Sequence, residues 1–257
     1  FNFEDYKKLV LKDYYTIFLS RETSILGRRE VLSGKGKFGI FGDGKELPQI
    51  AMNHFIENGD FRSGYYRDQT LLMAQGYLTP EDHFAALYAH PDIKYEPMSA
   101  GRQMVGHFSS KLIDENGNWL DQTKQRNHVA DVSSIGAQMP RLVGLAQASK
   151  IYRKLDIRGS EKFSKNGNEI AWGTIGNAAT SEGLFFESIN ACGVLQIPII
   201  ISVWDDEYGI SVHNKYQTTK ESISEALDGF RRSENKNGFE ILTVNGWDYV
   251  CLLYTSD

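Results

Sequence analysis

Two short turns carry side chains that could bind a divalent cation and a phosphate. The first, residues 175–183, contains Asn177 among small residues and follows an apolar run. The second, residues 204–209, follows the next apolar run and contains Asp206. In a parallel sheet, the carboxyl ends of neighbouring strands meet at one edge, and ligands bind there. Mg²⁺ takes oxygen ligands and usually keeps a substrate phosphate, so one carboxylate, one amide oxygen and one backbone carbonyl would suit it.

Each turn also has an ordinary explanation. A small-residue turn between a strand and a helix is common in Rossmann-like proteins, and an acidic turn such as 205–207 is commonly a solvated surface feature. Residues 42–44, Gly-Asp-Gly, are a second possible start for the same kind of motif, with Asp68 downstream. No apolar strand precedes Asp68, so we favour the turns after the two apolar runs. Residues 42–44 are then a loop outside the metal motif.

The elements around both turns predict the fold class. Residues 169–175 have an extended pattern, 181–195 a helical pattern, and 197–204 form an apolar run that is typical of a buried strand. Strands of this kind joined by helices are typical of a parallel sheet that helices cover on both faces. The sequence therefore predicts an α/β fold with a doubly wound parallel sheet.

Helical patterns dominate the first half of the chain. From Phe3 to Leu32, apolar residues recur at helical spacing, which predicts an amphipathic helix with one buried face. These apolar residues are Tyr6, Leu9, Val10, Tyr14, Ile17 and Phe18. Glycine-rich residues 33–44 predict an exposed loop. The other expected elements are helices at 47–57, after the N-cap Thr79 and at 139–154, a helix capped by Thr218 and Glu221, and a strand at 239–244.

Several segments occur in an order shared with one known family. Residues 176–183, 190–191, 197–200 and 205–211 together resemble the thiamine-diphosphate motif of the decarboxylating components of 2-oxo acid dehydrogenases, in their alpha-type half. The other segments that are similar to this family are 65–67 (Tyr-Tyr-Arg), 101–107 (Gly-Arg-Gln-Met-Val-Gly-His), 133–140 (Ser-Ser-Ile-Gly-Ala-Gln-Met-Pro) and 244–248 (Val-Asn-Gly-Trp-Asp). The resemblance covers roughly residues 20–250 and implies the thiamine-diphosphate-binding fold.

The resemblance implies a role for each matched residue. Magnesium would be held by Asn177, Asp206 and the backbone carbonyl of Tyr208. His107 would stabilise the substrate or transfer protons near it. The residues that would contact thiamine diphosphate are Tyr66 and Arg67 at the diphosphate, Ser133 and Ile135 at the aminopyrimidine ring, and Gly176, Asn177, Ala178, Ala179 and Asp206 around the metal.

The chain departs from this family at the metal motif itself. The family's motif usually starts Gly-Asp-Gly or Gly-Glu-Gly and closes with two asparagines, whereas this chain has Asn177 at the start and Asp205-Asp206 at the end. Because Asp and Asn have nearly the same shape and both offer a side-chain oxygen, we interpret the change as a compensated exchange. Trp204 stands where relatives carry an arginine, and with Asp205 it should weaken anion binding.

The resemblance also implies an activity and partners. Such a protein decarboxylates a small 2-oxo acid with thiamine diphosphate and magnesium, and passes the acyl group to a lipoyl group on an acyltransferase. A beta-type domain or subunit supplies the glutamate that activates the cofactor, so this chain alone should be inactive. The alternatives are another thiamine-diphosphate enzyme, such as a transketolase relative, and a non-catalytic assembly or regulatory subunit with a decayed metal site.

Composition limits the class of protein. The chain has 257 residues and a formal charge of −5, which argues against a nucleic-acid partner, and no apolar run is long enough for a membrane span. Its two cysteines are too few for a disulfide framework, which favours the cytoplasm. We expect one alpha-type domain over residues 1–250, incomplete at its C-terminus, and a non-native tail at 251–257. The start at Phe1 also indicates a partial sequence.

Overall fold

The computed structural model describes residues 2–103 and 106–256, and it divides into two compact units. Unit 1 comprises Phe1–Phe55, Tyr66–Phe108 and Val244–Asp257, and unit 2 comprises Ile56–Tyr65 and Ser109–Thr243. The expected bounds of a domain at 1–250 and a tail at 251–257 stay predictions.

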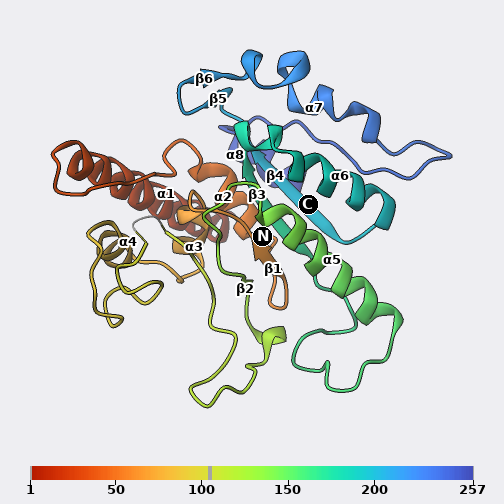
Figure 1. The fold of residues 1–257 in the computed structure, drawn as a ribbon, viewed down its shortest axis with the longest axis horizontal. Helices are drawn as coiled ribbons and strands as arrows, with labels where there is room; N and C mark the ends of the chain where they lie inside the picture. Colours follow the sequence, from red (N-terminus) through yellow and green to blue (C-terminus); the bar gives the residue numbers. More distant parts are fainter. Residues whose placement is uncertain (1, 104–105, 257) are drawn as a thin grey trace. The chain divides into compact units, whose positions relative to one another are not determined.

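Unit 1 is helical (Figure 1). Its helices are α1 (Phe3–Leu32), α2 (Glu46–Asn53), α3 (Gln69–Ala74), α4 (Pro80–Leu87) and α8 (Tyr249–Ser256). Thr79 caps α4 as expected, since its hydroxyl accepts from the Asp82 N–H at 3.1 Å while the Asp82 carboxylate accepts from the Thr79 N–H at 2.9 Å. Helix α2 ends at Asn53, earlier than the expected 57.

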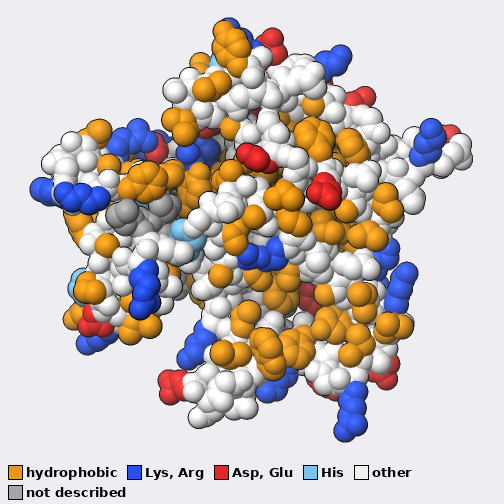
Figure 2. Space-filling view, in the orientation of Figure 1, with side chains coloured by type: hydrophobic (Ala, Val, Ile, Leu, Met, Phe, Trp, Pro, Cys, Tyr) orange, Lys and Arg blue, Asp and Glu red, His pale blue; other side chains and the backbone are white. Residues whose placement is uncertain are grey.

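The bounds predicted for the first helix are confirmed, but the prediction about its buried face is wrong. Of the six apolar residues, Tyr6, Tyr14 and Phe18 are exposed, and the others, Leu9, Val10 and Ile17, are only half-buried. Figure 2 shows hydrophobic side chains among lysines and arginines over α1. The residues that α1 buries are small or polar: Asp13, Ser20, Thr23, Ser24 and Gly27.

Hydrogen bonds explain why α1 buries its polar face. Gln69 on α3 donates to the Ser20 carbonyl at 3.1 Å and to the Ser24 hydroxyl at 2.8 Å. The Asp13 carboxylate lies 2.6 Å from His54 Nε2 and accepts from the Tyr249 hydroxyl at 2.5 Å. Buried polar groups need partners, and these contacts supply them.

Unit 2 contains a parallel four-stranded sheet with the strand order β2-β1-β3-β4 (Figure 1). The strands are β1 (Phe61–Ser63), β2 (Asn127–His128), β3 (Ala171–Gly176) and β4 (Ile199–Trp204). Helix α6 (Gly183–Leu195) joins β3 to β4, as expected, and α5 (Gln138–Lys154) precedes β3. The predicted α/β class with a parallel sheet is confirmed.

Two apolar clusters hold the helices of unit 2 on the sheet. One contains Met139 of α5, Ile175 of β3 and Phe185 of α6, all fully buried. The second contains Leu142 of α5, Ala171 of β3 and Cys192 of α6. Burial raises the pKa of the Cys192 thiol to about 11, which fits a core residue.

The remaining elements of unit 2 are short. They are the hairpin strands β5 (Tyr208–Gly209) and β6 (Val212–His213), helix α7 (Ile223–Ala226), and the 3₁₀ helices at Gln122–Lys124, Ala178–Ser181, Asn214–Tyr216, Thr219–Glu221 and Asp228–Phe230.

Two predictions in this part of the chain are wrong. Thr218 makes no side-chain cap, and Lys220 breaks the turn with a φ of 64°, so α7 is capped instead by Ser222, which accepts from the Glu225 N–H. No strand forms over residues 239–244, because within the described residues Phe239 makes only an isolated bridge to Arg231 and has no strand to join.

No helix among the residues that the structure describes is both long enough and apolar enough to cross a membrane.

Candidate functional site

The turn after β3 is buried and held by its own hydrogen bonds. Asn177 is only 3% exposed, and its Oδ1 accepts from the Ala178 N–H at 2.8 Å. Its backbone carbonyl accepts from the Thr180 N–H at 3.1 Å and from the Thr180 hydroxyl at 2.5 Å. The Asn177 Nδ2 atom is buried and has no hydrogen-bond partner among residues 2–103 and 106–256. This turn therefore presents one amide donor that these residues leave unsatisfied.

The turn after β4 is exposed and acidic. Asp205, Asp206 and Tyr208 all lie at the surface. The Asp205 Oδ1 accepts from the Glu207 N–H at 3.0 Å, and the Asp206 Oδ1 accepts from the Tyr208 N–H at 3.3 Å. A carboxylate has about four lone-pair sites, so each of these groups can accept further hydrogen bonds or ligate a metal.

The two turns meet at one edge of the sheet, as the sequence predicts. Gly176 is paired with Trp204 in the parallel register of β3 and β4, so the residues that follow them leave neighbouring strands at the same level. A Cβ at Gly209 would lie 2.5 Å from the Ala178 Cβ, so β5 packs directly on the first turn. The Ser181 hydroxyl donates to the Gln217 carbonyl at 3.0 Å and ties the two segments together.

A third turn, residues 133–137, lies beside the first. Ile135 packs against the apolar cluster that includes Ala179 and Phe185. Gly136 has a φ of 86°, and a Cβ there would lie 3.4 Å from the Glu182 side chain. Ser133 is exposed. The structure thus places Ile135 beside the first turn. It brings to one edge of the sheet six other predicted site residues of unit 2, namely Gly176, Asn177, Ala178, Ala179, Asp206 and Tyr208.

The other predicted site residues, Tyr66, Arg67 and His107, belong to unit 1. The Arg67 guanidinium carbon lies 5.7 Å from the centre of the Tyr66 ring, a cation–π distance. Gln49 donates to the Arg67 carbonyl at 3.0 Å, and a Cβ at Gly42 would lie 2.6 Å from the same oxygen. Close backbone approach therefore requires glycine at position 42, and residues 42–44 lie beside Arg67.

His107 is partly buried in unit 1. Met104 and Val105, which belong to the segment that carries its family resemblance, lie outside the described residues.

A buried charged cluster at the ends of β1 and β2 was missed by the sequence reasoning. Arg62 is fully buried, and its Nη2 lies 3.1 Å from an Asp131 carboxylate oxygen and donates to the Tyr65 carbonyl at 3.1 Å. His128, opposite Arg62 on β2, is also fully buried. Burial, Arg62 and Arg126 hold the pKa of His128 well below its usual value, so it is neutral. β1 and β2 are too short to give a sequence signal, so this cluster could not be placed.

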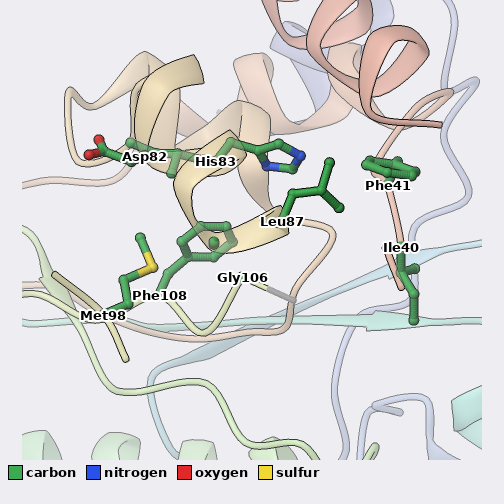
Figure 3. Close-up of a pocket in the computed structure, with 11 residues that line it drawn as sticks. Ile40, Phe41, Asp82, His83, Leu87, Met98, Gly106 and Phe108 are labelled. Atoms are coloured by element: carbon green, nitrogen blue, oxygen red, sulfur yellow. The ribbon is translucent and has the colours of Figure 1, made fainter. Parts of the chain in front are cut away.

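A small apolar cavity in unit 1 contains none of the predicted site residues (Figure 3). His83 and Leu87 of α4 lie across from Phe41, and the His83 and Phe41 rings are 5.9 Å apart. Burial lowers the pKa of His83 to about 4, so this side chain is neutral at pH 7. The cavity is too small and too apolar for a charged cofactor.

The residues at the edge of the sheet fit a magnesium diphosphate in the chemistry of their donor atoms. Asn177 Oδ1, the Asp206 carboxylate and the Tyr208 carbonyl are oxygens, which Mg²⁺ prefers. Among the described residues, no three His, Cys, Asp or Glu side chains gather into a metal site, so one carboxylate would carry the charge. The unpaired Asn177 Nδ2 fits a hydrogen-bond acceptor such as a phosphate oxygen.

In open parallel α/β sheets, ligands bind beyond the carboxyl ends of the strands, where the two turns meet in this chain. Residues 19–256 match the model of the dehydrogenase E1 component family, and the chain belongs to that family.

Curated relatives narrow the resemblance to alpha subunits. The chain is 30% identical to the 2-oxoisovalerate dehydrogenase subunit alpha of Bacillus subtilis over 241 residues. The matched region covers 91% of this chain and 60% of that protein. It is 28% identical to the mitochondrial 2-oxoisovalerate dehydrogenase subunit alpha of Caenorhabditis elegans, over 85% of this chain and 42% of that protein. It is 23% identical to the pyruvate dehydrogenase E1 component subunit alpha of Acholeplasma laidlawii, over 97% of this chain and 59% of that protein.

The chain therefore spans between about two fifths and three fifths of the length of these relatives. The similarity supports an alpha-type component of a 2-oxo acid dehydrogenase.

Proposed function

We propose that this chain is the part of a 2-oxo acid dehydrogenase that binds magnesium and thiamine diphosphate. The observation that carries the proposal is the meeting of the turns after β3 and β4, set by the Gly176–Trp204 pairing and by the contact of Gly209 with Ala178. Membership of the dehydrogenase E1 component family supports it.

In this proposal each of the two turns supplies part of the metal's ligands. Asn177 Oδ1 keeps a second lone pair beside its bond from the Ala178 N–H, and the exposed Asp206 supplies the negative charge. The Tyr208 carbonyl is the third ligand. Exchanging acid and amide relative to the usual motif leaves one carboxylate and one amide at the metal, so the exchange preserves the donor set.

The remaining predicted residues would orient the cofactor. Arg67, stacked near the Tyr66 ring, would give the diphosphate a charge-assisted hydrogen bond. Ile135 presents an apolar side chain at the turn beside the metal residues and would support the aminopyrimidine ring. Thiamine diphosphate, when bound, supplies the electron sink for decarboxylation, while the protein provides binding, orientation and electrostatics. His107 would hold or move a proton near the substrate.

The proposal extends to substrate, partners and location. The curated relatives are named for 2-oxoisovalerate and pyruvate, so a small 2-oxo acid is the proposed substrate class. A beta-type domain or subunit and a lipoyl-bearing acyltransferase are the proposed partners, because the acyl group needs an acceptor. A cytoplasmic location fits the two cysteines, Cys192 and Cys251, which are not joined in a disulfide.

Calorimetric titration tests the proposal. The full-length protein is titrated with thiamine diphosphate, with Mg²⁺ and after chelation, for wild type and for Asp206→Ala. We expect tight binding that is lost on chelation and weakened at least tenfold in the variant. Asp228→Ala, which removes another exposed carboxylate of unit 2, is the control and should bind like wild type.

The absence of binding in every condition would contradict the proposal. The alternative of a non-catalytic assembly subunit would then be favoured, because Trp204 stands where relatives carry an arginine and Asp205 adds negative charge nearby.

A further inference from the structure

The amide of Asn177 has one satisfied end and one unsatisfied end. Its oxygen must face the Ala178 N–H, because two donors would otherwise meet at 2.8 Å, and this fixes the position of the nitrogen. That nitrogen, Nδ2, is buried and has no hydrogen-bond partner in the part of the chain that the structure describes. Buried polar atoms in folded proteins are nearly always paired, so an unpaired one at a strand end indicates an acceptor that comes from outside.

The surroundings of Asn177 favour an anionic acceptor. Helix α6 begins a few residues later at Gly183. Its N-cap residue, Glu182, is exposed and makes no side-chain cap, and no acidic residue lies in the first turn of the helix. A Cβ at Gly183 would meet nothing within 4 Å, so the start of this 13-residue helix is open. Uncapped helix N-termini carry partial positive charge and free N–H groups, which favour phosphate.

We propose that Asn177 Nδ2 donates a hydrogen bond directly to an oxygen of the diphosphate, and that the site therefore keeps a metal-independent affinity for diphosphate. The proposal rests on the proposed function. By this proposal, the exchange of acid and amide does more than preserve the metal ligands, because it adds a hydrogen-bond donor to the diphosphate. An aspartate at this position has no donor and would repel the diphosphate unless a metal lay between them.

The inference predicts that the two exchanged residues act differently. Asn177 contributes with or without metal, through its nitrogen. Asp206 is a carboxylate and contributes only through the metal, because on its own it repels an anion. Removing each side chain in turn, with and without Mg²⁺, therefore separates the two contributions.

Inorganic pyrophosphate is the probe, because it carries the diphosphate chemistry without the thiamine ring. The full-length protein is titrated in EDTA and in Mg²⁺ for wild type, Asn177→Ala and Asp206→Asn, with Asn235→Ala as a matched control at an exposed asparagine. In EDTA we expect measurable binding by wild type, Asp206→Asn and the control, and binding about tenfold to a hundredfold weaker in Asn177→Ala, the range for one hydrogen bond to a charged group.

A second measurement keeps the test valid if Asn177→Ala folds poorly. In wild-type protein labelled with ¹⁵N-asparagine, the side-chain amide signal of Asn177 should shift when pyrophosphate is added in EDTA. The signal is assigned by its absence from Asn177→Asp.

Three results would overturn the inference. They are an unmoved Asn177 signal, wild-type affinity in Asn177→Ala, and pyrophosphate binding that vanishes in EDTA while thiamine diphosphate still binds with Mg²⁺. The last of these leaves the proposed function standing. Loss of thiamine diphosphate binding in every condition overturns both.

Discussion

The turn after β3 and the turn after β4 differ in what they expose to water. Asn177 is buried and its backbone is locked by Thr180, whereas Asp206 lies at the surface. Burying an unpaired carboxylate costs more than burying an amide, so the arrangement with the amide inside and the acid outside is the less costly one in the metal-free protein. The positions of the amide and the acid therefore follow burial as well as the number of metal ligands.

The largest loss of stability is expected on removing the buried Arg62 guanidinium, which lies at the same edge of the sheet. Arg62→Met would leave the Asp131 carboxylate buried without its cation, which should lower the free energy of unfolding of unit 2 by about 3–5 kcal/mol. Arg231→Met, which breaks an exposed ion pair with Asp228, should cost less than about 1 kcal/mol. Urea denaturation measures both, and equal losses would contradict the importance of burial.

In unit 1, protonation of His83 should make the stability depend on pH. The pKa of His83 is lowered to about 4, so the unfolded chain binds a proton more readily than the folded one, and stability should fall as the pH drops from about 6.5 towards 4. The loss attributable to His83 is at most about 3 kcal/mol. His83→Gln should flatten this part of the stability curve, measured by urea unfolding at several pH values. Parallel curves for the two proteins would contradict the lowered pKa of His83.

The contact between the two turns is tested at Gly209. A Cβ there would meet the Ala178 Cβ at 2.5 Å, so Gly209→Ala should lower the free energy of unfolding by about 1–3 kcal/mol. Gly183→Ala is the matched control, because open space surrounds that position, and it should change stability by less than about 0.5 kcal/mol. If the two variants are equally stable, β5 does not pack on the turn after β3.

The smallest effects come from exchanging acid and amide one at a time in metal-free protein. Asn177→Asp keeps the oxygen that bonds the Ala178 N–H but buries a carboxylate, so we expect a loss of about 1–2 kcal/mol at pH 7. Since burial raises the pKa of such a carboxyl, the loss should grow as pH rises. Asp206→Asn, at the surface, should stay within about 0.5 kcal/mol of wild type. Thermal unfolding checks the pair, and equal losses would remove the difference between the turns.

Strong local patterns predicted much of unit 2. The apolar run at 197–204 and the small-residue turn at Gly176 identified the strand ends, because buried parallel strands are continuously apolar. The same patterns predicted that Asn177 and Asp206 share one edge of the sheet, since the carboxyl ends of neighbouring parallel strands meet there.

Features that depend on tertiary contacts could not be predicted from the sequence. The apolar residues of α1 predicted the wrong buried face, since hydrogen bonds from Gln69 to Ser20 and Ser24 stabilise a polar one. The partnership of Arg62 with Asp131 joins positions far apart in the chain, and no local pattern predicts it. The Ala178 N–H bonds the oxygen of the Asn177 amide, which leaves the nitrogen buried and without a partner among the described residues. This depends on the backbone geometry of the turn, which the residue types alone do not reveal.

A double-mutant cycle on thiamine diphosphate binding in Mg²⁺ tests most directly whether the two turns form one site. Asn177→Ala, Asp206→Ala and the double variant are titrated calorimetrically beside wild type. If both side chains act on one magnesium diphosphate, their effects should be coupled by about 0.5–3 kcal/mol. Strictly additive effects, or no effect of either variant, would contradict a shared site at this edge of the sheet.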